Sequence, residues 1–183
     1  RDNSYYFNRA YDKAERGDHY GAISDYIKAL EINPNDAIAF YNRAISKYEL
    51  KDYYGAISDY TKALEINPKD IESFISRGLS KRNLKDYYGA ISDYIKALEI
   101  NPKYAKAYNN LGDAKNYLND YDGAIDDFSK AIEINPKYAM AFSNRGIVKK
   151  KTGDLLSACS DWSKASVLGY ETAERLHKKY CRQ

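Results

Sequence analysis

Apolar and small residues recur every three or four positions along most of this chain, which is the spacing of one face of an α-helix. Phe40, Ala44 and Tyr48 share one side of a first expected helix, and Ala56 and Tyr60 share one side of the next. Short polar turns separate these stretches. The pattern therefore predicts an all-α protein built from consecutive amphipathic helices.

The helical pattern returns at a fixed interval of 34 residues. This interval is marked by the dipeptide Asn-Pro, at 33–34, 67–68, 101–102 and 135–136. The runs 52–68 and 86–102 differ at one position, which indicates duplication. Periods of this length are typical of proteins that stack one supersecondary unit on the next. The expected repeats are 3–36, 37–70, 71–104, 105–138 and 139–172, followed by a tail at 173–183.

Each repeat reads as two helices joined by a short turn. An aspartate precedes every second helix, and its carboxylate can accept the backbone N–H groups that a helix start leaves unpaired. The Asn-Pro pair then ends that helix, because the residue before proline is pushed away from helical angles. The predicted cap residues are Asp18, Asp52, Asp86, Asp120 and Asp154.

Columns of equivalent residues explain how the two helices of a repeat can pack. One position in the first helix is always small: Ala10, Ala44, Gly78, Gly112 and Gly146. One position in the second helix is always aromatic: Tyr26, Tyr60, Tyr94, Phe128 and Trp162. Small side chains let the helices approach closely, and the large rings fill the remaining space.

These features resemble the tetratricopeptide repeat over residues 3–172. The resemblance implies a right-handed α-solenoid of five helical hairpins, and we expect residues 173–183 to form a C-terminal capping helix. The chain departs from the family pattern in one column, where lysine replaces the usual aromatic residue. That column is Lys13, Lys47, Lys81, Lys115 and Lys149.

In this family the first helices line the concave side of the solenoid, where ligands usually lie. The lining expected here is apolar and aromatic in the first three repeats and more polar in the last two. We therefore predict a groove for an apolar peptide or an amphipathic helix, since exposed apolar patches mark interaction sites. The alternative is that some of these side chains only pack against neighbouring first helices. The predicted groove residues are Phe7, Tyr11, Ile38, Tyr41, Ile45, Tyr48, Ile75 and Leu79.

Charged residues also fall into columns. Four of the five first helices carry an arginine four residues before the lysine of the column, whereas the fourth repeat has Leu111. Like charges at this spacing repel, so an acid should compensate them. We expect ion pairs with the aspartates of the second helices, Asp25, Asp59, Asp93, Asp127 and Asp161. The alternative is that the lysines bind phosphate or an acidic protein.

Composition excludes several functional classes. The net charge is only +3, from 29 basic and 26 acidic residues, which does not suggest a nucleic-acid binder. No apolar run approaches the ~18 residues of a membrane span. The chain begins at Arg1 without an initiator Met, so we expect a processed or trimmed protein. Its nearly identical repeats, rich in Lys, Asn, Tyr and Ile, suggest a bacterial member of the family. The location of the protein is unknown, and the cytoplasm is the default expectation.

Cysteine and histidine are too few to predict a redox or metal centre. Cys159 and Cys181 are expected to be free thiols, with a single disulfide that ties down the last helix as the alternative. His177 and Cys181 lie four residues apart, but a third ligand is lacking apart from Cys159. No phosphate-binding loop or nucleophile motif occurs. We expect no enzyme activity, no cofactor and no metal.

The sequence therefore predicts a protein–protein interaction scaffold whose partner, a protein or peptide, is unidentified. Two other interpretations stay open. The chain could assemble head to tail with copies of itself through the apolar N-terminal groove. It could also be the non-catalytic arm of a larger complex. The fold alone does not decide among them.

Overall fold

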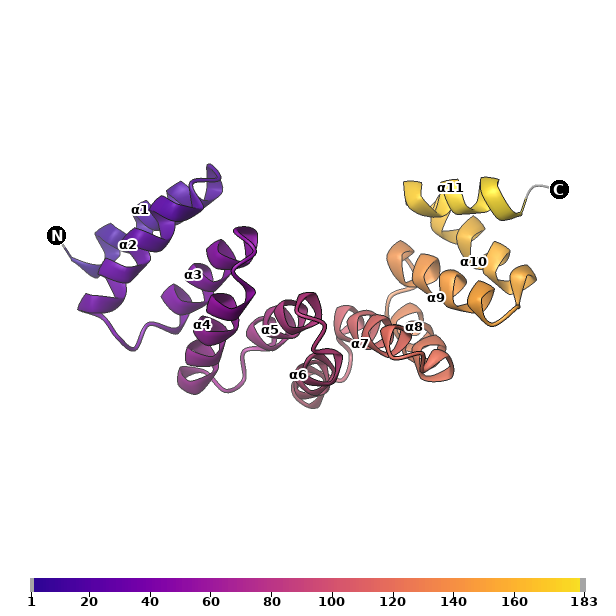
Figure 1. Cartoon of the computed structure of the whole chain (residues 1–183), viewed down its shortest axis with the longest axis horizontal. Coiled ribbons are helices and arrows are strands. Elements are labelled where there is room, and N and C mark those ends of the chain that lie inside the picture. The colour runs from indigo at the N-terminus through magenta and orange to yellow at the C-terminus, as the bar shows by residue number, and fades with distance from the viewer. Residues whose placement is uncertain (1, 182–183) are drawn as a thin grey trace. The chain divides into compact units, whose positions relative to one another are not determined.

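The computed structural model describes residues 2–181, and its eleven elements are all α-helices. The chain divides into two compact units between Ile100 and Asn101 (Figure 1). The N-terminal unit contains α1 (Asn3–Glu15), α2 (His19–Ile32), α3 (Ala37–Glu49), α4 (Tyr53–Ile66), α5 (Ile71–Asn83) and α6 (Tyr87–Ile100). The C-terminal unit contains α7 (Ala105–Tyr117), α8 (Tyr121–Ile134), α9 (Ala139–Lys151), α10 (Leu155–Val167) and α11 (Glu171–Tyr180).

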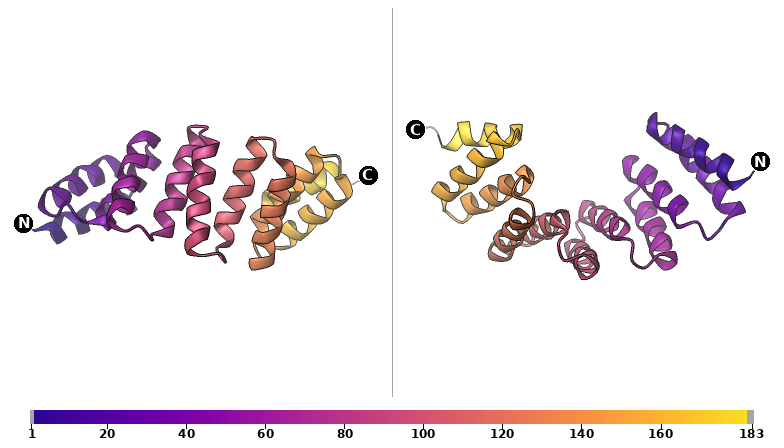
Figure 2. Two further views of the ribbon diagram at one scale, coloured as in Figure 1. Left: turned by 90° about the horizontal axis from the view of Figure 1, so that it is seen from below. Right: turned by 180° about the vertical axis from the view of Figure 1, so that it is seen from behind.

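Consecutive helices pack as hairpins within each unit (Figure 2). In the N-terminal unit α1 pairs with α2, α3 with α4, and α5 with α6. In the C-terminal unit α7 pairs with α8 and α9 with α10, and α11 packs on α10. The all-α, hairpin-based fold expected from the sequence is thus confirmed. Helix α11 begins at Glu171, two residues before the tail expected to form it, and residues 182 and 183 of that tail lie outside the described part.

The aspartates that precede the second helices cap them as predicted. Each carboxylate accepts the backbone N–H of the residue three positions on, with N···O distances of 2.9 to 3.1 Å. In four of the five hairpins that residue is a glycine, and its missing side chain leaves room for the carboxylate. The caps therefore define where each second helix begins.

The core of each hairpin is the aromatic column packed against the small column. The five aromatic residues are 0 to 2% exposed. A Cβ atom placed on Gly78 would lie 2.5 Å from Cε1 of Tyr94, and one on Gly146 would lie 2.7 Å from Nε1 of Trp162. The absence of a side chain at these glycines is what lets the larger rings lie flat against the first helix.

The predicted ion pairs join the two helices of each hairpin. In the second hairpin, Arg43 donates two hydrogen bonds to Asp59, at 2.8 and 2.7 Å, and Lys47 lies 2.7 Å from the same carboxylate. All five lysines of the column are bound to these aspartates, which leaves the phosphate-binding alternative without support. The other pairs are Asp25 with Arg9 and Lys13, Asp93 with Arg77 and Lys81, Asp127 with Lys115, and Asp161 with Arg145 and Lys149.

These ion pairs also connect neighbouring hairpins within a unit. Arg77 donates to the hydroxyl of Thr61 at 3.0 Å, and Arg145 donates to the hydroxyl of Ser129 at 2.9 Å. Both hydroxyls belong to the second helix of the preceding hairpin. Two of the four arginines thus also bond across the junction between repeats, which the sequence columns alone did not indicate.

The expectation of free thiols is wrong, because Cys159 and Cys181 form a disulfide. Helix α11 lies on α10 through Ala173, Leu176 and Tyr180, which join the cluster around Trp162. This packing brings the two Cα atoms to 5.7 Å although 22 residues separate them in sequence. The bonded sulfurs are therefore not available as thiolate ligands beside His177.

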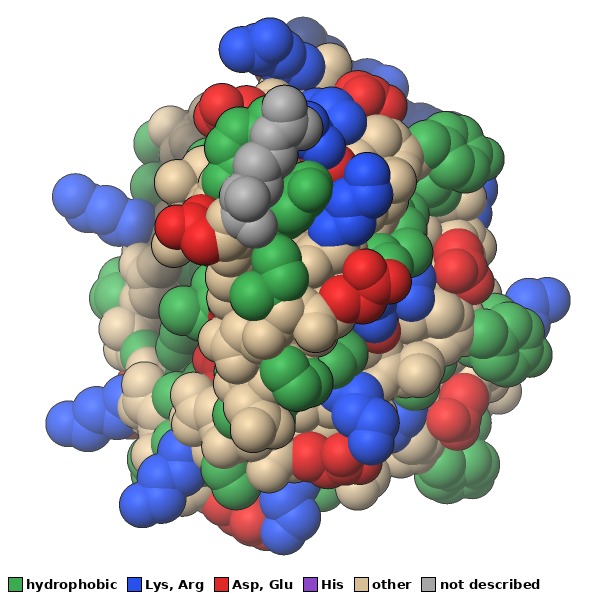
Figure 3. Space-filling model, turned by 90° about the vertical axis from the view of Figure 1, so that its left-hand side faces the viewer, with side chains coloured by type: hydrophobic (Ala, Val, Ile, Leu, Met, Phe, Trp, Pro, Cys, Tyr) green, Lys and Arg blue, Asp and Glu red, His purple; other side chains and the backbone are tan. Residues whose placement is uncertain are grey.

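Charges of both signs are mixed on the face shown in Figure 3, where lysine and arginine side chains alternate with acidic ones. No strongly basic patch appears on that face. Within residues 2–181, none of the helices has both the length and the hydropathy needed to cross a lipid bilayer.

Candidate functional site

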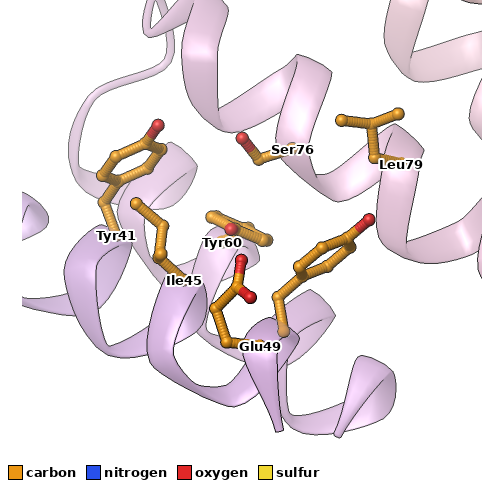
Figure 4. Close-up of a pocket in the computed structure, with 7 residues that line it drawn as sticks. Tyr41, Ile45, Glu49, Tyr60, Ser76 and Leu79 are labelled. Carbon is orange, nitrogen blue, oxygen red and sulfur yellow. The ribbon is translucent and has the colours of Figure 1, made fainter. Parts of the chain in front are cut away.

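A cavity of about 170 Å³ opens between α3 and α5 of the N-terminal unit (Figure 4). Helix α3 contributes most of its wall, α4 contributes one ring, and α5 closes the opposite side. This volume is well below the roughly 300 Å³ at the lower end of small-molecule sites. The lining residues are Tyr41, Ile45, Tyr48, Glu49, Tyr60, Ser76 and Leu79.

Helical spacing places these side chains on facing surfaces. Tyr41, Ile45 and Tyr48 lie four and three residues apart, so they form one stripe along α3. Asp36 fixes the start of that helix by accepting the N–H groups of Ile38 and Ala39, at 3.1 and 3.0 Å. Asp36 therefore fixes where the helix that carries this stripe begins.

The floor of the cavity is aromatic. Tyr60 of α4 is only 2% exposed, and its ring centre lies 5.6 Å from that of Tyr41. Burial raises the pKa values of both tyrosines above the ordinary value. Both rings therefore present neutral phenol groups at physiological pH, which can donate as well as accept hydrogen bonds.

A hydrogen bond holds α3 and α5 together beside the cavity. Asn83 donates to the hydroxyl of Tyr48 at 2.9 Å and to the carbonyl of Leu79 at 3.0 Å. The ring of Tyr48 also packs edge-on against Tyr53, with centroids 5.4 Å apart. These contacts fix the ring of Tyr48, so that the cavity exists before any partner binds.

Two further hollows continue the cavity toward α1. Tyr41 is shared with a hollow of about 290 Å³ that also involves Ile38, Asp70 and Glu72. Ile38 in turn is shared with a hollow of about 310 Å³ that involves Phe7 and other residues of α1. Because neighbouring hollows share a wall residue, they form a continuous row across α1, α3 and α5. We call this row the first-helix groove.

The structure assigns different places to the eight residues predicted from the sequence. Tyr41, Ile45, Tyr48 and Leu79 line the central cavity. Phe7 and Ile38 line the hollows beside it. Tyr11 is 48% exposed on α1 but is not part of the lining of these three hollows.

The prediction that Ile75 lines the groove is wrong, because this residue is fully buried and cannot contact a partner. It occupies the repeat position of Phe7 and Tyr41, whose longer aromatic side chains reach the groove. The shorter isoleucine ends within the packed core. For this residue the packing alternative was the right one.

Two lining residues were missed by the sequence interpretation. Glu49 follows Tyr48 directly and lies one turn beyond Ile45, and Ser76 follows Ile75. Both would have been found by continuing the helical spacing without requiring an apolar residue. Because only apolar residues were sought, the sequence interpretation selected the preceding residues, Tyr48 and Ile75, instead.

The first helices of the C-terminal unit use their polar residues to hold one another. Asn144 of α9 donates to Asn109 of α7 at 3.1 Å, and Lys151 donates to Asn116 at 2.8 Å. Asn109 and Ser143 are 3% and 1% exposed. Asn109 and Asn116 of the expected mixed lining are therefore occupied by contacts between α7 and α9.

The groove combines apolar walls with a few polar groups. Its central cavity holds hydroxyl groups and a carboxylate, and its lining includes neither histidine nor cysteine. Across residues 2–181, no three His, Cys, Asp or Glu side chains gather in a way that could hold a metal ion. Apolar walls with a few polar groups at defined positions are typical of recognition sites.

Comparison with protein families gives two matching models. The model described as tetratricopeptide repeat matches residues 37–70 and 105–138, and the model described as TPR repeat matches residues 10–51 and 78–116. Together they span residues 10–70 and 78–138. A comparison with curated proteins finds no match.

Several solved structures share the fold. MamA from Desulfovibrio magneticus RS-1 has 21% identity and a TM-score of 0.84, over 92% of this chain and 96% of that one. YrrB, described as a TPR protein with an unusual peptide-binding site, has 24% identity and a TM-score of 0.75, over 95% and 90%. PilF from Pseudomonas aeruginosa has 20% identity and a TM-score of 0.79, over 90% and 75%.

Proposed function

Because the chain belongs to the tetratricopeptide repeat family, we propose that it is a protein-interaction scaffold whose first-helix groove binds a peptide segment or amphipathic helix of a partner protein. The observation that carries this proposal is the row of three hollows, in which Tyr41 links the first to the second and Ile38 links the second to the third. A row of hollows along one face matches a partner segment that presents side chains at regular intervals.

The size of the hollows supports a peptide over a small molecule. The central cavity, at about 170 Å³, is smaller than typical small-molecule sites, and the flanking hollows, at about 290 and 310 Å³, lie at the lower end of their range of roughly 300–1,000 Å³. Burying one leucine-sized side chain in such a hollow contributes about 1.5–3 kcal/mol. Several anchors along the row are enough for specific binding without a large interface.

Exposure of the groove residues supports the same proposal. Ile38 is 63% exposed, although its neighbour Ala39 is fully buried in the hairpin core. An isoleucine at the junction of two hollows contributes little to folding and offers apolar surface to a partner. YrrB, which shares this fold, is described as having a peptide-binding site, and that description agrees with a peptide ligand here.

The test is capture of partners by matched variants. Ile45→Asp places a charge in the central cavity, and Ile27→Asp makes the same change at a 42%-exposed site on α2 outside the groove. We expect the wild type and Ile27→Asp to capture the same proteins, and Ile45→Asp to lose them. A peptide from the captured protein should then bind the wild type at least tenfold more tightly than it binds Ile45→Asp, as measured by fluorescence anisotropy.

Equal capture by all three proteins, with unchanged melting temperatures, would contradict groove binding. The melting temperatures matter because Ile45 also packs against the cluster that contains Ala44 and Tyr60. A variant that fails to fold is replaced by Leu79→Ser, which alters the α5 wall of the same cavity.

A second candidate function is head-to-tail assembly of this chain. Helix α10 carries Leu156 and Val167 with 89% and 86% of their surface exposed. Apolar side chains this exposed could enter the groove of another copy. Sedimentation velocity across a wide concentration range tests this candidate. Growth of oligomers that Leu156→Asp, Val167→Asp or Ile45→Asp abolishes would support it, and a constant monomer would exclude it.

A further inference from the structure

Glu49 gives the central cavity a negative charge that nothing in the described residues neutralises. Its side chain is exposed at the end of α3, and Figure 4 shows the carboxylate pointing toward Tyr60 inside the ring of lining residues. No ion pair to Glu49 forms within residues 2–181. By contrast, Asp59 in the same hairpin is held by both Arg43 and Lys47.

The two neighbouring hollows are also lined by negatively charged side chains. Asp36 lines the hollow beside α1, and Asp70 lines the hollow between α3 and α5. Both carboxylates already accept hydrogen bonds, from backbone N–H groups in the case of Asp36 and from the Ser73 hydroxyl in the case of Asp70. No lysine or arginine lines any of the three hollows. The whole groove therefore favours a positively charged ligand.

A purely apolar occupant does not fit the central cavity. It would pack well on Ile45 and Leu79, but it would cover the Glu49 carboxylate without offering it a partner. Covering a polar group in this way costs about 1–3 kcal/mol, and more when the group is charged. That cost offsets the gain from burying one apolar side chain.

A basic side chain meets both requirements. The carbon stem of lysine or arginine can lie against apolar surface while its charged end stays at the polar rim. Tyrosine rings add favourable contacts with a cation. We propose that the central cavity receives a lysine or arginine side chain of the partner segment, whose stem packs between Ile45 and Leu79 and whose cation pairs with Glu49. This inference rests on the proposed function.

The test uses peptides selected on the whole protein. A phage-displayed library of random twelve-residue peptides is selected on the wild type, and the selected peptides are synthesised with a fluorescent label. Binding is measured by anisotropy to the wild type, Glu49→Gln, Ile45→Asp and Glu15→Gln. Glu15 is the matched control, because it occupies the position of Glu49 one repeat earlier and does not line the central cavity.

We expect the selected peptides to share a lysine or arginine and to bind Glu49→Gln roughly five- to tenfold more weakly than the wild type. Glu15→Gln should bind as the wild type does. Replacing the shared lysine by norleucine, or the shared arginine by citrulline, should weaken binding to the wild type. The same replacement should have little effect on binding to Glu49→Gln, because the pair is already broken.

The possible failures are distinguishable. Peptides that need Ile45 but lack a basic residue and ignore Glu49→Gln would overturn this inference and leave the proposed function intact. Peptides whose binding is unchanged by both Ile45→Asp and Glu49→Gln would overturn both. If Glu49→Gln and Glu15→Gln weaken peptide binding equally, the peptides are attracted to negative charge in general. That result would also overturn the assignment of the cation to this cavity.

Discussion

Leu111 occupies the position where the other four repeats have an arginine, and Asp127 on the facing helix is therefore bound by Lys115 alone among the described residues. Asp127 is 7% exposed, and burial raises its pKa above the ordinary value of 3.8. In the first hairpin the hydrogen bond from Arg9 has the opposite effect and lowers the pKa of Asp25 to about 2. The same aspartate column thus contains both stabilised and destabilised carboxylates.

This difference predicts unequal costs for the same substitution. Asp59→Asn leaves Arg43 and Lys47 without their shared carboxylate, and we expect the free energy of unfolding to fall by about 3 kcal/mol. Asp127→Asn removes a charge that burial already disfavours, so the expected loss is about 1 kcal/mol or less. Urea unfolding of the two variants measures the difference. Equal losses would contradict the role assigned to the missing arginine.

The two carboxylates should also respond to pH in opposite directions. Since the pKa of Asp25 is lowered, the contribution of this carboxylate to stability is complete above pH 3.8 and is lost as the pH falls toward 2. The cost of Asp25→Asn should therefore shrink over that interval. Since the pKa of Asp127 is raised, protonation in the folded state relieves its penalty as the pH falls through that raised value.

Thermal melts of wild type, Asp25→Asn and Asp127→Asn from pH 7 to pH 2 separate these effects. Relative to Asp127→Asn, the wild type should gain stability as the pH falls from neutral toward 4. Relative to Asp25→Asn, it should lose stability below 4. A parallel pH profile for all three proteins would contradict both pKa assignments.

The disulfide between Cys159 and Cys181 should hold α11 in place. A cross-link that closes a loop of 22 residues contributes about 3 kcal/mol in the chain-entropy description. We expect reduction, or the Cys159→Ser variant, to lower stability by up to that amount and to speed hydrogen exchange in α11 first. A count of two reactive thiols in the native, unreduced protein would contradict the bond.

Two lysines between the helices of a hairpin are held in a conformation that suits glycine. Lys51 and Lys85 have φ angles of 62° and 63°, and the first and last hairpins have Gly17 and Gly153 at the same position. A side chain in this left-handed region costs about 1–2 kcal/mol. Lys85→Gly should therefore raise stability by roughly 0.5–1 kcal/mol after the loss of chain entropy.

The reverse change is the control. Gly153→Lys introduces the same strain, because Gly153 has a φ angle of 91°, while the space around it is open. We expect this variant to lose about as much stability as Lys85→Gly gains, in matched chemical unfolding curves. A loss in both variants would show that the lysine side chain contributes contacts that outweigh the backbone strain.

Sequence alone determined the parts of this protein that depend on local spacing. The capping role of Asp52, the burial of Tyr60 and the pairing of Arg43 with Asp59 all follow from residues that recur at one repeat position. Once two columns lie on the two helices of one hairpin, the short turn between them fixes which side chains meet. These features are therefore determined by the sequence alone.

Only the tertiary structure decided features that depend on side-chain length and on distant packing. Ile75 and Tyr41 share a repeat position, but one ends in the core and the other reaches the groove, because their side chains differ in size. Glu49 lines the cavity only because α5 packs opposite it. Cys159 and Cys181 meet only because α11 lies on α10. Periodicity shows which face a residue occupies, whereas contact across helices depends on how closely those faces approach.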